Sequence, residues 1–199
     1  RLGAHLDRLR AGADVLGFHP PWPDDRIVAA LAATLAANGL RAGTARLTLT
    51  RGPAGRGLAP PAEAQPTLMI AAFPPAPPAG PVRAVIARTT RRNEYSPLAG
   101  IKSLNRLDDA LARREAARPG AADALLLNGA GRLAEASAAN LFVVLGGVPA
   151  TPPLSDGALP GTVRAVLLRD HGAVERSIGP AELAGADEAF LTNALGLRA

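Results

Sequence analysis

The sequence predicts a mixed α/β protein of two domains, and three observations lead to that prediction. Of its 199 residues, 48% are hydrophobic and 20% are charged, a composition typical of globular proteins with a buried core. Segments with the apolar spacing of helices alternate with short segments typical of strands. A proline-dense stretch, residues 74–81, interrupts this order and is interpreted as a stiff linker. The domain boundary is therefore expected near residue 77.

The first domain, residues 1–76, is expected to contain two helices followed by two strands. Apolar residues recur at steps of three and four over residues 2–16, which predicts an amphipathic helix. A second helix is predicted over residues 24–39, because acidic residues open the segment and Asn-Gly closes it. Residues 46–50 alternate as a strand does, and the apolar residues 67–73 predict a second strand.

The second domain, residues 77–199, is expected to mix strands with helices. The predicted strands are residues 82–88, 173–178 and 188–192, the predicted helices are residues 103–118 and 161–170, and residues 123–145 are expected to be hairpin-like. Ser103 is the candidate N-cap of the first of these helices, which Pro119-Gly120 ends. Asn128-Gly129 provides a favourable hairpin turn.

Composition excludes several classes of function. The chain has no cysteine and three scattered histidines, so neither thiol chemistry nor a metal site is predicted. It contains no apolar run of about 18 residues, so no membrane span is expected. The net charge is +5, but the arginines are dispersed and aromatic residues make up 3% of the chain. Nucleic acid is therefore not an expected partner.

The basic residues contain one exception. Of the 22 lysines and arginines, only Lys102 is a lysine. Arginine stays protonated and is no amine nucleophile, whereas a lysine with a lowered pKa forms a Schiff base. Apolar neighbours suit a desolvated amine at this position. The alternatives are that one lysine remained by chance, or that Lys102 extends into solvent at a helix start.

Glu135 lies between a predicted strand and the small residues 136–139. A buried carboxylate is costly unless it is paired, and a protonated pyridine nitrogen of a cofactor is one suitable partner. The alternative is a surface glutamate beside Arg132.

Three further segments could bind anions. The backbone N–H groups of residues 161–163 open a predicted helix, where phosphate binds favourably, although an ordinary capped helix has the same sequence. A turn at residues 192–195 could add further N–H groups, or it could be a simple Asn turn. The arginines of the glycine-bearing loop 51–57 could present a guanidinium fork to a carboxylate, or the loop could be merely solvated.

Taken in order, these motifs resemble the class IV, or fold type IV, pyridoxal-phosphate enzymes. The resemblance rests on Lys102, on Glu135 followed by Asn-Leu-Phe at 140–142, on Leu-Pro-Gly at 159–161 and on Thr-Asn at 192–193. It implies a small α/β N-terminal domain and a larger pseudo-barrel C-terminal domain. It also implies that the small domain lacks its first strands and the large domain its final strands.

The resemblance assigns a role to each matching residue. Lys102 would hold pyridoxal 5'-phosphate covalently through its amine and move protons, and Glu135 would bind the pyridine nitrogen. The implied phosphate contacts are Arg8, Gly161, Thr162, Val163, Asn193 and Ala194. Arg56 and Arg106 would contact an amino substrate that carries a carboxylate.

Within the class, the sequence looks most similar to 4-amino-4-deoxychorismate lyase of folate biosynthesis, which releases pyruvate and 4-aminobenzoate. The alternative is an aminotransferase acting on D-amino or branched-chain amino acids. Leu58 departs from the lyase pattern, which often has an aromatic there, and Ala194 departs from the aminotransferases, which often have threonine. The resemblance further implies a cytoplasmic homodimer. A non-catalytic arginine-rich domain is the alternative from another functional class.

Overall fold

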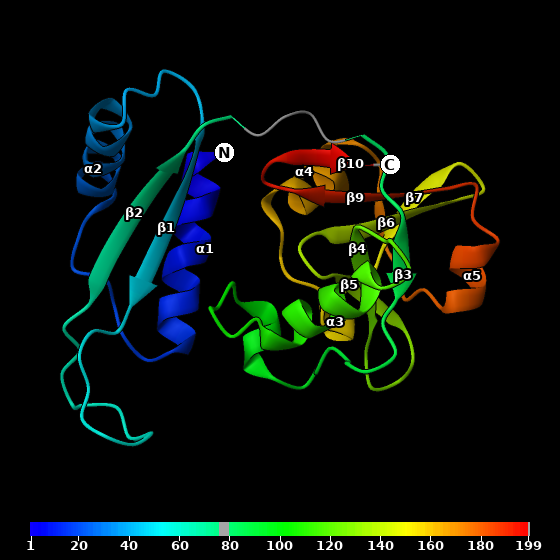
Figure 1. Ribbon diagram of the computed structural model, residues 1–199, viewed down its shortest axis with the longest axis horizontal. Helices are drawn as coiled ribbons and strands as arrows, with labels where there is room; N and C mark the ends of the chain where they lie inside the picture. Colours follow the sequence, from blue (N-terminus) through cyan, green and yellow to red (C-terminus); the bar gives the residue numbers. More distant parts are fainter. Residues whose placement is uncertain (76–79, 199) are drawn as a thin grey trace. The chain divides into compact units, whose positions relative to one another are not determined.

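The chain divides into two compact units, Arg1–Pro77 and Pro78–Ala199. The computed structural model describes residues 1–75 and 80–198, and Figure 1 shows both units. The boundary expected near residue 77 lies outside the described residues. None of the helices in the described part of the chain has the length and apolar character that a membrane crossing requires.

The first unit consists of two helices and one pair of strands, in the predicted order (Figure 1). The elements are α1 (Leu2–Val15), α2 (Asp24–Ala37), β1 (Thr44–Thr50) and β2 (Thr67–Phe73). The two strands pair antiparallel from Thr44 opposite Phe73 to Thr50 opposite Thr67. The acidic residues Asp24 and Asp25 lie in the first turn of α2, where the helix dipole favours negative charge.

The second unit contains two sheets with helices around them (Figure 1). Its strands are β3 (Ala84–Ile86), β4 (Asp123–Leu127), β5 (Leu133–Ala136), β6 (Asn140–Leu145), β7 (Val148–Thr151), β8 (Val174–Glu175), β9 (Glu188–Asn193) and β10 (Gly196–Arg198). Its helices are the 3-10 turns η1 (Pro97–Gly100) and η2 (Leu154–Asp156) and the α-helices α3 (Leu107–Ala117), α4 (Thr162–Asp170) and α5 (Pro180–Ala184). The sheet orders are β10-β9-β6-β7-β8 and β3-β4-β5.

Several boundaries in the second unit differ from the prediction. The prediction of Ser103 as a helix cap is wrong, because α3 begins at Leu107 and its N-cap is Arg106. The Ser103 hydroxyl instead accepts a hydrogen bond from the Asn105 N–H (3.3 Å), a local contact that competes with helix formation. Strands β3 and β8 are shorter than predicted, and β7, α5 and β10 were not predicted as elements. Short elements carry little periodic signal.

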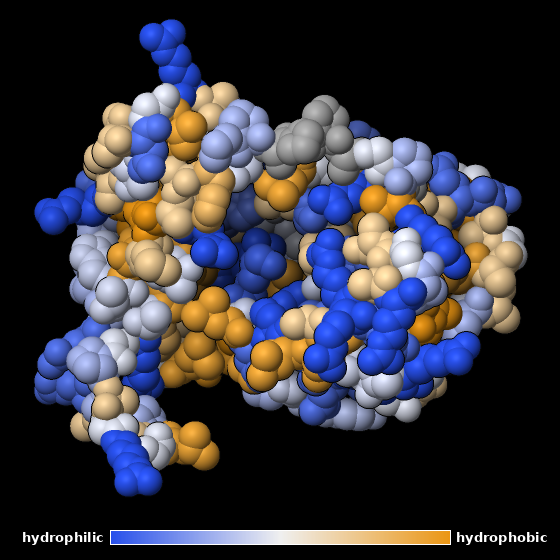
Figure 2. Space-filling model, viewed as in Figure 1, coloured by the Kyte–Doolittle hydropathy of each residue, from blue (hydrophilic) through white to orange (hydrophobic). Residues whose placement is uncertain are grey.

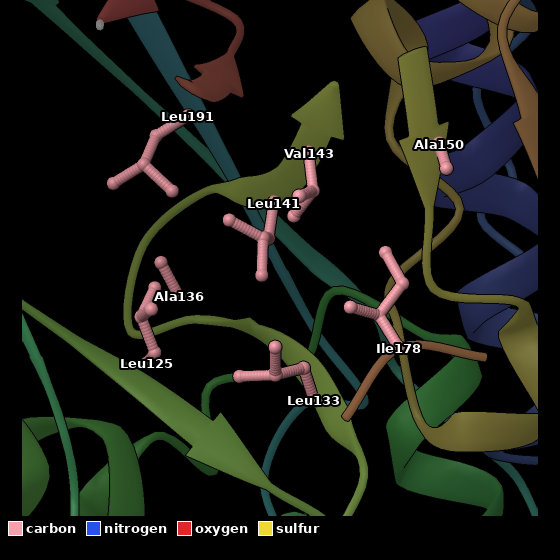
Figure 3. Close-up of a cluster of buried hydrophobic side chains, with 8 residues drawn as sticks. All are labelled: Leu125, Leu133, Ala136, Leu141, Val143, Ala150, Ile178 and Leu191. Carbon is pink, nitrogen blue, oxygen red and sulfur yellow. The ribbon is translucent and has the colours of Figure 1, made fainter. Parts of the chain in front are cut away.

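The core of the second unit lies where side chains of its two sheets meet. Figure 3 shows eight buried apolar side chains gathered there, contributed by β4, β5, β6, β7 and β9 together with Ile178. Leu133, Val143 and Ile178 are completely buried. This packing explains why β5 is buried along its whole length, including the one acidic residue it carries.

The surface carries hydrophilic and hydrophobic side chains side by side (Figure 2). Two exposed apolar residues are Leu104, just before α3, and Leu107, at its start, with 71% and 75% of their surface exposed. Exposed apolar residues are normal on folded proteins, so they carry no functional argument alone.

Candidate functional site

Glu135 on β5, the acidic residue of the predicted site, is buried, with 3% of its surface exposed. The Leu159 N–H donates to its Oε2 atom (3.0 Å), and the guanidinium of Arg92 lies 3.1 Å from Oε1. The alternative of a surface glutamate beside Arg132 is therefore wrong. The carboxylate is buried because β5 is buried along its whole length, with Leu133 before Glu135 and Ala136 after it in the hydrophobic core.

Arg92 is a functional candidate that the sequence did not reveal. Its backbone N–H donates to Leu127 O (2.8 Å), which places it beside β4, the neighbour of β5. The guanidinium donates to Gly157 O (3.0 Å) and to Ala99 O (3.2 Å). The nearby Ala99 and two segments distant in sequence, at Leu127 and Gly157, thus hold Arg92 against Glu135. Arg92 stands in an adjacent arginine pair that resembles any solvated pair, so no local signal distinguished it.

Asp109 and Arg106 extend this charged cluster. The Oδ2 atom of Asp109 lies 2.9 Å from Arg106 Nε and 3.9 Å from Arg92 Nη1. Arg106 also donates to Ser137 O (2.7 Å), in the turn between β5 and β6. The predicted substrate residue Arg106 is therefore engaged with the protein itself.

Burial and ion pairing act in opposite directions on the two carboxylates. Burial raises the pKa of Glu135 above its ordinary value, and the charge of Arg92 and the Leu159 N–H oppose that rise. Burial likewise raises the pKa of Asp109, against the charges of Arg106 and Arg92. The ionised form of Glu135 therefore depends on its partners.

Asn140 connects Glu135 to the start of α4. Its Nδ2 group donates to Leu159 O (2.8 Å) and lies 3.5 Å from Glu135 Oε2. Gly161 is the N-cap of α4, and a Cβ atom there would come within 1.9 Å of Asn140 Oδ1. The three candidate residues Gly161, Thr162 and Val163 thus begin a helix that Asn140 holds beside the buried carboxylate. Within the described part of the chain, no side-chain hydrogen bond caps this helix.

The predicted turn at Asn193-Ala194 follows β9. Asn193 donates through Nδ2 to Ala138 O (3.3 Å) and accepts from the Leu195 N–H (2.9 Å). Thr192 pairs with Asn140 in the register between β6 and β9. The turn is thereby joined to the strand that carries Asn140, and its role toward phosphate stays a prediction.

Lys102 follows η1 in a segment that is not helical. Its neighbour Ile101 is buried, with 5% exposed, whereas Lys102 itself is exposed. Its apolar neighbour Leu104 is exposed as well, and the expected desolvation of the Lys102 amine stays a prediction. The hydrogen bond from Arg92 to Ala99 O nevertheless ties this segment to the Glu135 cluster.

The first unit carries the remaining candidates. Arg8 lies half-buried on α1, 3.4 Å from the His5 ring, and burial lowers its pKa. The fork of Arg51 donates to the carbonyls of Leu16, Gly17 and Pro61. Of the two arginines considered in this loop, Arg51 therefore directs its fork to the backbone of its own unit. Arg56 lies exposed in the same loop and remains the candidate there.

The comparison with protein families decides the class. The family model described as amino-transferase class IV matches residues 1–198. This chain belongs to that family. An archaeal relative from Methanocaldococcus jannaschii is 33% identical over 96% of the chain. The branched-chain-amino-acid aminotransferase of Escherichia coli K12 is 29% identical over 83% of the chain.

Solved structures of class IV enzymes match the chain closely. The 4-amino-4-deoxychorismate lyase from Pseudomonas aeruginosa is 38% identical, with a TM-score of 0.83 over 98% of this chain and 75% of that one. The E. coli branched-chain aminotransferase is 28% identical, with a TM-score of 0.88 over 98% of this chain and 68% of that one. The chain spans 69% of the archaeal relative, 56% of the curated E. coli enzyme and 37% of an Arabidopsis thaliana relative.

Enzymes of this class use pyridoxal phosphate, and a branched-chain aminotransferase from Thermobaculum terrenum was solved in its pyridoxal-phosphate form. Two features of the present site fit that group. Glu135 Oε1 is buried and, among the described residues, accepts no hydrogen bond despite the nearby Arg92, so it retains a lone pair for a protonated ring nitrogen. The start of α4, with Gly161 as its N-cap, presents the backbone N–H groups and helix dipole that favour phosphate.

Proposed function

We propose that this chain forms the cofactor site of a pyridoxal-phosphate-dependent aminotransferase whose amino donor is a branched-chain or similar apolar amino acid. The observation that carries the proposal is the buried Glu135 carboxylate, joined through Asn140 to the start of α4 and through Arg92 to the segment of Lys102. The branched-chain aminotransferases among its curated relatives support this donor over the lyase.

The residues of the second unit divide the work of binding. Glu135 would hold the ring nitrogen in its protonated form, and the N–H groups of Thr162 and Val163 would bind the phosphate. The turn at Asn193-Ala194 would add N–H groups to the same phosphate. In the first unit, Arg8 would contact the phosphate and Arg56 the substrate carboxylate.

Lys102 would provide the proton chemistry. When bound, pyridoxal phosphate withdraws electrons from the substrate carbon that bears the amine. The Nζ amine of Lys102 would take the proton from that carbon and return it at a second position, acting as base and then as acid. Arg106, which pairs with Asp109 and donates to Ser137 O, would line the substrate side of the site.

A 4-amino-4-deoxychorismate lyase is the second candidate, because solved lyases match this chain over nearly its whole length, one at 38% identity. The same Lys102 would remove the same type of proton, and loss of pyruvate would replace transfer of the amine. The lyase reaction needs no amino-group acceptor, so product analysis separates the two activities.

The deciding experiment mixes the purified chain with pyridoxal phosphate and follows the visible absorbance of the lysine-bound cofactor. Lys102→Ala should abolish that absorbance, and Lys102→Arg should do the same while keeping the charge. Absorbance that persists in Lys102→Ala contradicts the proposal. The loaded chain is then given branched-chain amino acids with 2-oxoglutarate, and separately aminodeoxychorismate alone. Formation of 4-aminobenzoate without amino transfer would favour the lyase.

The pseudo-barrel topology of the larger domain, the homodimer, the cytoplasmic location and the link to folate synthesis remain predictions. Size-exclusion chromatography with light scattering tests the homodimer directly.

A further inference from the structure

Glu135 and Asp109 share one arginine. Arg92 lies 3.1 Å from Glu135 through Nη2 and 3.9 Å from Asp109 through Nη1. Arg106 binds the far side of Asp109 at 2.9 Å. The four groups form a charged chain in the order Glu135, Arg92, Asp109, Arg106, and both carboxylates are at least 95% buried.

The position of Arg92 is determined by the backbone as well as by charge. Two of its donors bind the carbonyls of Gly157 and Ala99. The Cγ atom of Arg92 also packs against Gly157, where a Cβ atom on residue 157 would come within 2.8 Å of it. These contacts fix the guanidinium of Arg92, and with it the positive charge, at one position beside Glu135.

We propose that Arg92 is a positioning residue for Glu135: it holds that carboxylate charged and oriented toward the ring nitrogen of the cofactor, while Asp109, paired with Arg106, moderates the effect. The proposal rests on the proposed binding of pyridoxal phosphate at Glu135. It assigns Arg92 no contact with substrate.

The electrostatic consequence has a definite sign. A proton shared by Glu135 and a ring nitrogen resides on the nitrogen only while the carboxylate form is favoured. Arg92 favours that form, and burial and the negative charge of Asp109 oppose it. Removing the cation should move the proton toward Glu135, and removing the charge of Asp109 should move it toward the ring nitrogen.

The test compares Arg92→Gln, Arg92→Lys and Asp109→Asn with the unaltered chain. Arg176→Gln is the matched control, because Arg176 is paired with Glu182 on the surface of the same unit. With isotope-labelled pyridoxal phosphate bound, the NMR shift of the ring nitrogen reports its protonation at neutral pH. Without cofactor, the carboxyl shift of labelled Glu135 reports its titration.

Arg92→Gln should raise the midpoint of Glu135 titration in the cofactor-free chain by about 1–3 pH units. It should also change the ratio of protonated carboxyl to protonated ring nitrogen by about tenfold or more, in favour of the carboxyl. Arg92→Lys should give a smaller shift of the same sign, because one ammonium group retains the charge but not the fork. Asp109→Asn should shift both signals the opposite way, and Arg176→Gln should shift neither.

If Arg92→Gln and Asp109→Asn shifted the Glu135 titration in the same direction, the proposal would be overturned. A mere loss of packing would act in one direction in both variants, whereas the loss of a positive and of a negative charge acts in opposite directions. An unchanged Glu135 titration in Arg92→Gln would overturn it too. If Arg92→Gln does not fold, Arg92→Lys decides by the same criterion. Failure of the unaltered chain to bind cofactor would instead contradict the proposed function, and the cofactor-free titration would still test Arg92.

Discussion

Replacement of Gly161 by alanine tests how Asn140 connects the start of α4 to Glu135. The backbone of Gly161 has φ −74° and ψ 142°, which any residue adopts, so the substitution adds no backbone strain. The new Cβ would lie 1.9 Å from Asn140 Oδ1, where contacts under 3.0 Å are essentially never seen. Asn140 must therefore move by about 1.1 Å or more.

That movement has a calculable cost. Overpacking a buried site costs about 1–3 kcal/mol. Displacing Asn140, which is 6% exposed, also breaks its 2.8 Å hydrogen bond to Leu159 O, and an unsatisfied buried group costs about 1–3 kcal/mol more. We expect Gly161→Ala to lower the free energy of unfolding by roughly 2–6 kcal/mol. We also expect weaker cofactor binding, because Leu159 and Glu135 lose their common partner.

The assay is urea unfolding of the full chain without cofactor, followed by titration with pyridoxal phosphate. Gly3→Ala is the control, because nothing lies within 4 Å of a Cβ at Gly3 and that residue is helical. Asn140→Ala removes the obstructing oxygen, so the Gly161→Ala change should cost much less in that background. Equal costs in both backgrounds, or a total cost below about 0.5 kcal/mol, would refute the argument.

Three further predictions follow from the same structure. In the cofactor-free chain, the raised pKa of Glu135 contributes stability that is fully present below the ordinary glutamate pKa and is lost as the pH rises through the pKa of the folded state. Glu135→Gln should therefore flatten this part of the plot of unfolding free energy against pH. An unchanged slope would contradict the burial argument. Arg51→Ala removes three hydrogen bonds to backbone carbonyls and should speed proteolysis of the loop between β1 and β2, whereas the exposed Arg56→Ala should not. Leu133→Ala should lower the free energy of unfolding by about 2–5 kcal/mol in a urea titration, because Leu133 is completely buried between the sheets; a change below about 1 kcal/mol would mean that the core tolerates the cavity.

Local signals predicted the first unit well. The second strand runs from Thr67 to Phe73 as predicted, and α2 begins at Asp24 as predicted. Both elements have signals contained within a few residues, namely an apolar run and an acidic first turn. The α3 boundary was missed because Ser103 forms a short-range hydrogen bond that resembles a cap in sequence but does not start a helix.

The candidate site divides along similar lines. Gly161 and the start of α4 were predicted from sequence, since Pro-Gly before an amphipathic segment is a local pattern. Arg92 and Asp109 were not predicted, because Arg92 pairs with Glu135, 43 residues further along the chain, and Asp109 pairs with Arg92, 17 residues before it. The sequence did not reveal that Arg51 binds within its own unit, because its acceptors include Leu16 and Gly17, at 35 and 34 residues' separation.

The sequence by itself determined the family and the chemical types of the site: one lysine among arginines, one carboxylate before small residues, and a Pro-Gly helix start. These are properties of single residues and short segments, so the sequence alone shows them. Only the tertiary structure decided that Glu135 is buried, which arginine neutralises it and which glycine leaves room for Asn140. Burial and ion pairing depend on the packing of distant segments, and it is this packing that determines which charge state the carboxylate takes.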